Sequence, residues 1–341
     1  MYHIFVYIIA ILYLNMIHVY CSDSDINNGL RIAVGSCNNH KREGIWDIVS
    51  HHKPQKMILL GDNMYADKRT GFTTGFGVFE EANHTELGAE YDLFGEDESY
   101  QDLLLEIGGL SNVYAIYDDH DYGINNGGAD YQYKQQSRDE FNKFFQVDYS
   151  HSHRKTLEDG VYSSHIVEEL VDGVVLRIKV IMLDVRYNRI MQPSESCDLL
   201  GDEQWRWLQG ELDSSIYNHN STHTNTDTPI TVCDDVQSNG VCVNATDTTD
   251  TPVDLILIGS GTQILPQGKM IEETWDKDCV PNRERLLDML SDTIEQSILT
   301  NTAGTSPNGI STGVSDNHIN ILLLSGDVHG AEISQVYIGY I

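Results

Sequence analysis

The segment that decides the fold spans residues 57–67 and reads MILLGDNMYAD. Four apolar residues at 57–60 are followed at once by glycine, aspartate and asparagine. A short apolar run that ends in such a turn signal is typical of a buried strand. Asp62 then stands at the carboxyl end of that strand, which is where ligand sites lie in α/β sheets. The segment therefore predicts a buried strand followed by a functional loop.

The same pattern of an apolar run ending in glycine, serine or aspartate recurs along the chain. It is found at residues 31–35 (RIAVG), 113–117 (VYAIY, then DDHD), 174–183 (VVLRIKVIML, then DVRY), 255–258 (LILI, then GSGTQ) and 319–324 (INILLL, then SGDVHG). Apolar residues at three- and four-residue spacing predict helices at 45–52, 100–107, 136–145, 202–212 and 283–298. Alternating strands and helices indicate an α/β layer fold.

Two polar stretches interrupt this alternation. Residues 214–252 are rich in Asn, Thr, Ser and Asp, and residues 301–317 are rich in Gly, Ser, Thr and Asn. Neither composition can bury a core, so we expect two surface insertions. We expect no domain boundary in either, and we interpret residues 22–341 as one domain.

Composition excludes several classes of protein. The chain has 341 residues, 40% of them hydrophobic, which is too apolar for a disordered acidic tail. Its 21 Lys and Arg against 52 Asp and Glu give a formal charge of −31. A phosphate-backbone binder needs a basic face, so we expect no nucleic-acid surface. The same charge argues against docking on anionic lipid.

The N-terminus suggests a secreted protein. Residues 1–22 contain no Asp, Glu, Lys or Arg, and the apolar stretch at 4–14 is short for a membrane span. We interpret residues 1–21 as a cleaved signal peptide; the alternative is an uncleaved anchor that tethers the protein to a membrane. The N-x-S/T sequons at Asn83, Asn220 and Asn244 are candidate glycosylation sites in a secretory compartment.

Cysteine usage fits an oxidising compartment. Cleavage of the signal removes Cys21 and leaves five cysteines, an odd number, so one thiol can have another task. Cys37 is our candidate for that task. The other four allow three pairings, of which we favour Cys233–Cys242 across a short loop and Cys197–Cys279 across a long one.

The predicted strand ends bring many polar side chains to one rim. They are Cys37, Asp62, Asn63, Tyr65, Asp118, Asp119, His120, Asp121, Asp184, Arg186, Asp327 and His329. So many carboxylates repel one another unless some are protonated or cations lie among them. Carboxylates suit hard cations such as Ca²⁺, whereas His, Tyr and thiolate suit iron or zinc. The mixed set predicts a polynuclear metal site.

Each of these residues also has a simpler explanation. Asp62 is well placed to cap a helix, Tyr65 to fill the core, and Cys37 to be a small buried side chain. A single histidine, such as His120 or His329, is more often a satisfied polar residue than a ligand. The joint order of G-D-N-x-Y, D-D-H-D and G-D-V-H, each after an apolar run, favours the metal site over caps and core.

On these motifs the chain resembles the PhoD-like metallophosphatases (alkaline phosphatase D family) of the calcineurin-like metallophosphoesterase superfamily. The resemblance rests on GSCN at 35–38, LGDNMYAD at 60–67, YDDHDYG at 117–123, LDVRY at 183–187, GSGTQ at 259–263 and LSGDVHGAE at 324–332. It implies a four-layer α/β/β/α sandwich of two mixed sheets flanked by helices. It also implies hydrolysis of phosphate monoesters or diesters with Fe³⁺ and Ca²⁺, other divalent metals being alternatives.

Carried over by this resemblance, Asp62 bridges two metals. Cys37, Tyr65 and His329 complete the iron site, and Asp118, Asp119 and Asp327 hold the calcium side. Asn63, His120 and Arg186 contact the substrate, with His120 as the acid and Arg186 as a phosphate clamp. The expected substrate is a small-molecule or lipid-linked phosphate ester, and no stable partner protein is implied. The alternative is a secreted glycoprotein that keeps the fold as a non-catalytic binding module.

One glycine-rich segment has two interpretations. Residues 69–91 contain four glycines and no strong periodicity. The segment is either a lid over the metals or an ordinary surface loop, and we favour the loop.

Overall fold

The computed structural model describes residues 7–10, 29–39, 44–73, 76–147, 159–171, 174–190, 196–216, 230–233, 242–245, 253–266, 273–303 and 319–327. Within these ranges the chain is a mixed α/β protein with two four-stranded sheets and two separate strand pairs. The first sheet has the order β1-β2-β3-β6, and all its strands are parallel. Its strands are Tyr7–Ala10, Arg31–Gly35, Lys56–Leu60 and Val113–Ile116.

The second sheet has the order β12-β11-β8-β7. The neighbours β12, β11 and β8 are parallel, and β7 closes the edge as the antiparallel partner of β8. Its strands, in chain order, are β7 (Ser163–Val171), β8 (Val174–Leu183), β11 (Leu255–Ser260) and β12 (Asn320–Ser325). The sheet is therefore mixed.

The strand β8 shows why the sheets face each other. Its residues Ile178, Val180 and Met182 belong to a core shared with Ile58 and Leu60 of β3. The alternate residues Ile181 and Leu183 point to a second core with the helices α6 and α8. Successive side chains of a strand point to opposite faces, so a continuous apolar run buries both faces of the sheet.

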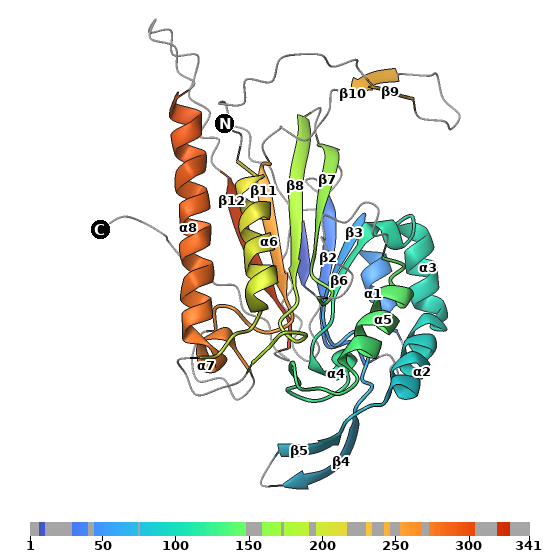
Figure 1. Ribbon diagram of the computed structural model, residues 1–341. Helices are drawn as coiled ribbons and strands as arrows, with labels where there is room; N and C mark the ends of the chain where they lie inside the picture. The colour runs from blue at the N-terminus through green and yellow to red at the C-terminus, as the bar shows by residue number, and fades with distance from the viewer. Residues whose placement is uncertain are drawn as a thin grey trace, which may run out of the picture.

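Helices lie on the outer sides of the two sheets in Figure 1. α6 (Gly201–Asp213) and α8 (Val280–Ala303) lie beside the second sheet, and the short α7 (Trp275–Asp278) precedes α8. The helices beside the first sheet are α1 (Ile45–His51), α2 (His84–Gly95), α3 (Glu98–Glu106) and α5 (Lys134–Phe144). A 3₁₀ turn, η2 (Leu110–Asn112), leads into β6, and the single-turn helix α4 (Asp119–Tyr122) follows it.

Close packing between the sheets requires glycine at one position. A Cβ added at Gly259 of β11 would lie 2.8 Å from the Met182 sulfur and 2.9 Å from Leu60 Cδ2. These separations are well below ordinary van der Waals contact, so β11 packs closely against Leu60 of β3 in the facing sheet. This packing brings the carboxyl ends of both sheets to one rim.

All six strands expected from the apolar runs are confirmed, as are the five expected helices, with ends that differ by a few residues. The alternation did not predict β7, α2, α4 or the hairpin of β4 (Lys68–Thr73) and β5 (Phe76–Glu80). In the hairpin, register shifts between Arg69 and Gly71. The described part of residues 69–91 therefore contains two paired strands and the start of α2, in a segment that we expect from the sequence to be a surface loop.

The strand β1 lies inside the segment that we interpret as a signal peptide. Its backbone pairs in parallel with β2, Tyr7 opposite Arg31. Cleavage after residue 21 would remove this strand and leave β2 at the sheet edge, and the signal peptide stays a prediction. In the part of the chain that the structure describes, no helix is long and apolar enough to span a membrane.

The polar stretches are described only in part. Within 214–252, β9 (Ile230–Cys233) and β10 (Cys242–Ala245) form an antiparallel pair with Cys233 opposite Cys242. Most of 301–317 lies outside the described residues.

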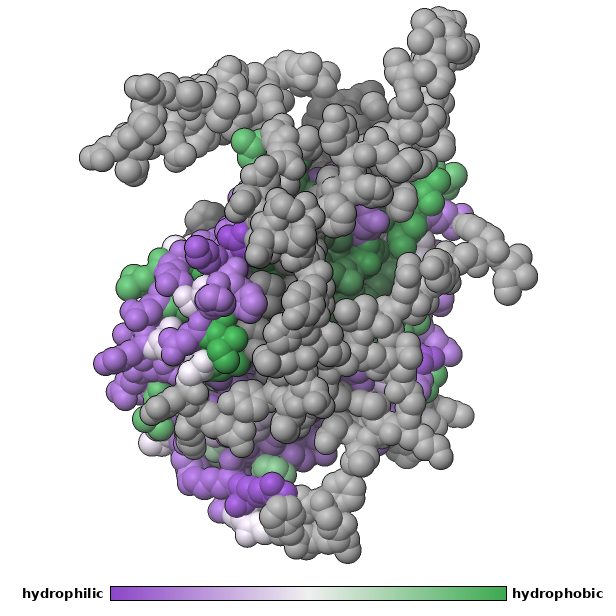
Figure 2. Space-filling model, turned by 180° about the vertical axis from the view of Figure 1, so that it is seen from behind, coloured by the Kyte–Doolittle hydropathy of each residue, from purple (hydrophilic) through white to green (hydrophobic). Residues whose placement is uncertain are grey.

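In Figure 2 the coloured surface at the lower left is mainly hydrophilic with separate hydrophobic residues. The exposed apolar side chains of α1–α3 are Ile48, Leu93 and Leu105, and single residues of this kind are ordinary on a folded surface.

Candidate metal centre

The loop after β3 places Asp62 in an unusual backbone conformation. Gly61 and Asp62 have φ angles of 86° and 51°, both in the left-handed region. At Gly61 only glycine fits, because an added Cβ would lie 2.4 Å from Asp118 Cβ and 2.6 Å from Asp118 N. This close approach brings the loop after β3 against the loop after β6. Asp62 and Asp118 therefore reach the same rim.

Asp121 joins these two loops. Its Oδ1 accepts hydrogen bonds from the backbone N–H of Asp62 (3.1 Å) and of Asp118 (2.6 Å). Its Oδ2 accepts from Asn63 N (3.1 Å) and Asn63 Nδ2 (2.6 Å). A buried carboxylate with donors on both oxygens fixes the backbone of both loops. The sequence motif contains Asp121, but its spacing alone did not indicate this positioning role.

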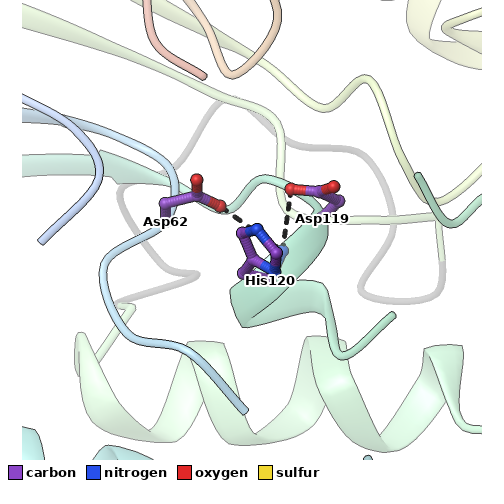
Figure 3. Close-up of side chains that lie close together, drawn as sticks. All are labelled: Asp62, Asp119 and His120. Carbon is purple, nitrogen blue, oxygen red and sulfur yellow. Dashed lines mark hydrogen bonds between the residues drawn. The ribbon is translucent and has the colours of Figure 1, made fainter. Parts of the chain in front are cut away.

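Two groups of side chains could hold a metal ion. The first group consists of Asp62, Asp119 and His120, and the second group consists of Asp118, Asp119 and Asp327. Within each group, every residue offers one ligand atom, and these atoms lie within 4.8 Å of one another. Asp119 belongs to both groups. Figure 3 shows Asp62 and Asp119 on either side of His120, and both carboxylates accept a hydrogen bond from its backbone N–H, at 3.3 Å and 2.9 Å.

Two carboxylate oxygens of the second group are buried without a hydrogen-bond partner among the described residues. They are Oδ2 of Asp118 and Oδ2 of Asp327. Gly261, which follows β11, packs tightly against Asp118, since a Cβ there would lie 2.6 Å from Asp118 Oδ1. A buried oxygen without a donor is costly, and a cation would remove that cost. These residues fit a bound metal.

The pKa shifts of the carboxyl groups at the centre agree with this fit. Burial, together with the neighbouring carboxylates, raises the pKa of Asp327 to about 9. Burial also raises the pKa of Asp118 to about 6, although Arg186 opposes the shift. The pKa of Asp62 is raised well above its ordinary value by burial and by Asp119. Burial also tends to raise the pKa of Asp119, but the positive charges of Arg186 and His120 have the larger effect and lower this pKa below its ordinary value.

Cys37 and Tyr65 lie beside Asp62, as expected from the sequence. The Tyr65 hydroxyl donates to Asp62 Oδ2 over 3.4 Å, and the Cys37 thiol lies 3.5 Å from the backbone oxygen of Asp327. Cys37 has a φ of 57° and no disulfide partner among the described residues. Burial and the charge of Asp62 raise the pKa of both groups, so both are neutral without a cation. His329 lies outside the described residues.

His120 forms a dyad with Asp67, for which the sequence motifs predicted no role. His120 Nδ1 lies 2.8 Å from Asp67 Oδ1, and the imidazole packs beside the rings of Tyr65 and Phe79, with centroids 4.4 Å and 5.2 Å away. Burial lowers the pKa of His120, but Asp119, Asp67 and Asp62 outweigh it and raise the pKa to about 10. His120 is therefore protonated at neutral pH and can donate a proton.

Arg186 and Asn63, the expected substrate contacts, are both buried and bonded to protein groups. The Arg186 side chain is 0% exposed, and it donates from Nε to Asp118 Oδ1 and from Nη1 to Glu273 Oε2, both at 2.6 Å. The Asn63 amide donates to Ile116 O and to Asp121. In this geometry both side chains position other groups of the centre, and their contact with a substrate stays a prediction. Burial of this kind cannot be inferred from residue type.

The remaining predicted sites are the four other cysteines and the three glycosylation sequons. Cys197 and Cys279 are joined by a disulfide, whereas nothing is described of the side chains of Cys233 and Cys242. Asn83 caps α2, and its side chain accepts hydrogen bonds from Thr85 N and Glu86 N. Asn220 lies outside the described residues, and only the backbone of Asn244 is described, in β10. The three glycosylation sites stay predictions.

Comparisons of the chain with family models, with curated proteins and with solved structures found no match. The case for a function therefore depends on the residues and on the geometry of the centre.

Proposed function

We propose that this chain is a secreted, metal-dependent hydrolase of phosphate esters, built as a four-layer α/β/β/α sandwich with the metal centre at the strand ends. The observation that carries the proposal is the pair of buried carboxylate oxygens of Asp118 and Asp327 that have no hydrogen-bond partner among the described residues. They lie beside Asp119, which also belongs to the group with Asp62 and His120. In this proposal the carboxylates of both groups hold the metals and His120 stays free as a proton donor. Two adjoining groups that share one carboxylate suit two metal ions better than a single structural ion.

The donor types support a division between two metals. Tyr65 donates to Asp62 and the Cys37 thiol lies near the Asp327 backbone, and a thiol with a phenol suits iron. Asp118, Asp119 and Asp327 supply oxygen ligands on the other side, which suits calcium. We propose Fe³⁺ and Ca²⁺ on these grounds together with the family resemblance. The bound metals would supply Lewis-acid polarisation of the phosphoryl group and an activated water for attack on phosphorus.

The protein's own groups have separate tasks in this proposal. His120, held by Asp67 at 2.8 Å, donates a proton to the leaving alkoxide. Asp121 holds the two ligand-bearing loops at a fixed separation. Arg186 fixes Asp118 and offsets part of the negative charge of the centre. The substrate is a small-molecule or lipid-linked phosphate ester, whose negative charge the acidic protein could hold only with the help of cations.

The test combines metal content with turnover of two synthetic esters. Protein secreted from eukaryotic cells is examined by elemental analysis and assayed with mono- and bis-nitrophenyl phosphate. We expect iron and calcium at stoichiometric levels together with release of nitrophenol, and the ratio of the two rates identifies the preferred ester class. A folded, metal-free and inactive protein would refute the proposal and favour the alternative of a non-catalytic binding module.

A further inference from the structure

A row of buried charges leads away from the metal centre. Asp118 pairs with Arg186, Arg186 with Glu273, Glu273 with Arg189, and Arg189 with Asp278. Negative and positive groups alternate along this charge row, and every side chain in it is at most 8% exposed. Its inner end, Asp118, is a proposed metal ligand, whereas its outer end belongs to α7. Glu273 is the only carboxylate in the row that contacts two arginines.

Glu273 determines which carboxylates Arg186 can reach. Its Oε2 accepts from Arg186 Nη1 (2.6 Å) and Arg189 Nη1 (3.2 Å), and its Oε1 pairs with Arg189 Nη2. The remaining nitrogen of Arg186, Nη2, has no hydrogen-bond partner among the described residues and lies 3.9 Å from Asp119 Oδ1. Without Glu273, the buried guanidinium would have to replace a lost partner, and Asp119 is the nearest carboxylate available to it.

Such a shift would act directly against a bound cation. Asp119 is the carboxylate shared by both candidate ligand groups. An arginine paired closely with Asp119 would occupy a ligand oxygen and bring its positive charge nearer to the metals. Loss of the Glu273 charge would also make the surroundings of the centre less negative. Both effects weaken metal binding.

The surroundings of Glu273 hold it in place. The next residue, Thr274, pairs its backbone with Gln263 in an isolated parallel bridge and caps α7. Trp275 is buried, and its indole N–H donates to Ser260 Oγ at the end of β11. The disulfide from Cys279 to Cys197 secures the other end of α7. Glu273 is therefore fixed to the sheet that carries the centre.

We propose that Glu273 is a positioning residue for the metal centre: it holds Arg186 on Asp118 and away from Asp119, so that Asp119 stays free for the metals. This inference rests on the proposed function, because it concerns the affinity of the same centre. No sequence pattern indicates a role for Glu273, which lies outside all the motifs.

The test measures metal affinity and does not require activity. Calorimetric titration of the metal-free protein with Ca²⁺ and, separately, with Mn²⁺ compares wild type with Glu273→Gln, which removes the charge and keeps the size. Glu211→Gln is the matched control, because Glu211 is equally buried (8% against 7% exposed) and pairs with Lys179 at a site without contacts to the centre among the described residues. Glu273→Asp keeps the charge but is one methylene too short to contact both arginines fully.

We expect Glu273→Gln to weaken metal binding by about 10- to 100-fold, the range found for groups that orient metal ligands. Glu211→Gln should bind metals within about twofold of wild type, even where both variants lose similar thermal stability. Glu273→Asp should show a smaller loss than Glu273→Gln, and it provides the comparison if Glu273→Gln fails to fold.

Three outcomes would overturn the inference. Wild-type affinity in Glu273→Gln, or in Glu273→Asp if only that variant folds, would show that Glu273 does not support the centre. An equal loss in Glu211→Gln would show a general effect of a broken buried ion pair. Both of these leave the proposed function intact, whereas a wild-type protein that binds neither ion would refute the proposed function and this inference together.

Discussion

Replacement of Gly61 by alanine should disrupt the rim of the proposed centre. The new Cβ would lie 2.4 Å from Asp118 Cβ and 2.9 Å from the Tyr117 carbonyl carbon, about 1 Å closer than ordinary contact. The neighbours are backbone or backbone-attached atoms, which cannot rotate aside as a flexible side chain would. The loop that carries Asp118 would have to move.

The magnitude has two parts. The left-handed φ of 86° costs alanine about 1 kcal/mol, and overpacking adds about 1 to 3 kcal/mol. We therefore expect Gly61→Ala to lower the free energy of unfolding by about 2 to 4 kcal/mol. The matched control is Gly44→Ala: Gly44 has a φ of 92°, but no described atom lies within 4 Å of its added Cβ. That variant should lose only about 1 kcal/mol.

The assay is urea-induced unfolding of the two metal-free variants and wild type, followed by calorimetric titration with Ca²⁺. Gly61→Ala should lose both stability and metal affinity, whereas Gly44→Ala should keep wild-type affinity. If the two variants differ in the free energy of unfolding by less than about 0.5 kcal/mol, the close approach of the loops after β3 and β6 is wrong.

Three further predictions concern individual side chains of the centre. Asp62→Asn should abolish hydrolysis and release metal while the fold survives. Its control is Asp97→Asn, which changes a helix cap away from the centre. Near-normal activity of Asp62→Asn would exclude a bridging role for Asp62. Cys37→Ser should weaken iron binding more than calcium binding, as measured by elemental analysis after dialysis, and equal loss of both metals would make Cys37 structural. Asp67→Asn should lower the pKa of His120, which is about 10 in the metal-free protein against an ordinary 6.5. Because the pKa of His120 is raised on folding, the stabilisation due to His120 is complete below pH 6.5 and is lost as the pH rises to about 10. Asp67→Asn should therefore flatten the pH dependence of the free energy of unfolding over this window. An unchanged profile would show that Asp67 does not determine the charge of His120.

Much of the fold could be predicted because its strands are buried on both faces. Continuous apolar runs such as LILI at 255–258 carry a strong signal, and the polar residues after them mark the strand ends. The strand β7 carries a weaker signal, since its sequence SSHIVEELV mixes polar and apolar residues at the edge of a sheet. The hairpin β4–β5 was missed because its glycines and threonines give no clear period.

For the candidate centre, only the residues that supply ligands could be predicted from the sequence. The motifs identified Asp62, Asp119 and their neighbours, because a strand end fixes where the next side chain lies. They could not show that Arg186 and Asn63 turn inward, because direction and burial depend on partners remote in the sequence. Glu273 lies 87 positions from Arg186 in the sequence, so no local spacing relates them.

The central claim is that metals lie between the side chains at the strand ends, and anomalous X-ray scattering from crystals of the secreted protein tests it most directly. Data collected at the iron absorption edge should give a peak within bonding distance of Asp62, with a second, non-iron density peak bounded by Asp118, Asp119 and Asp327. Crystals of the folded protein that show no metal density among these carboxylates, or only an ion elsewhere on the surface, would contradict the account.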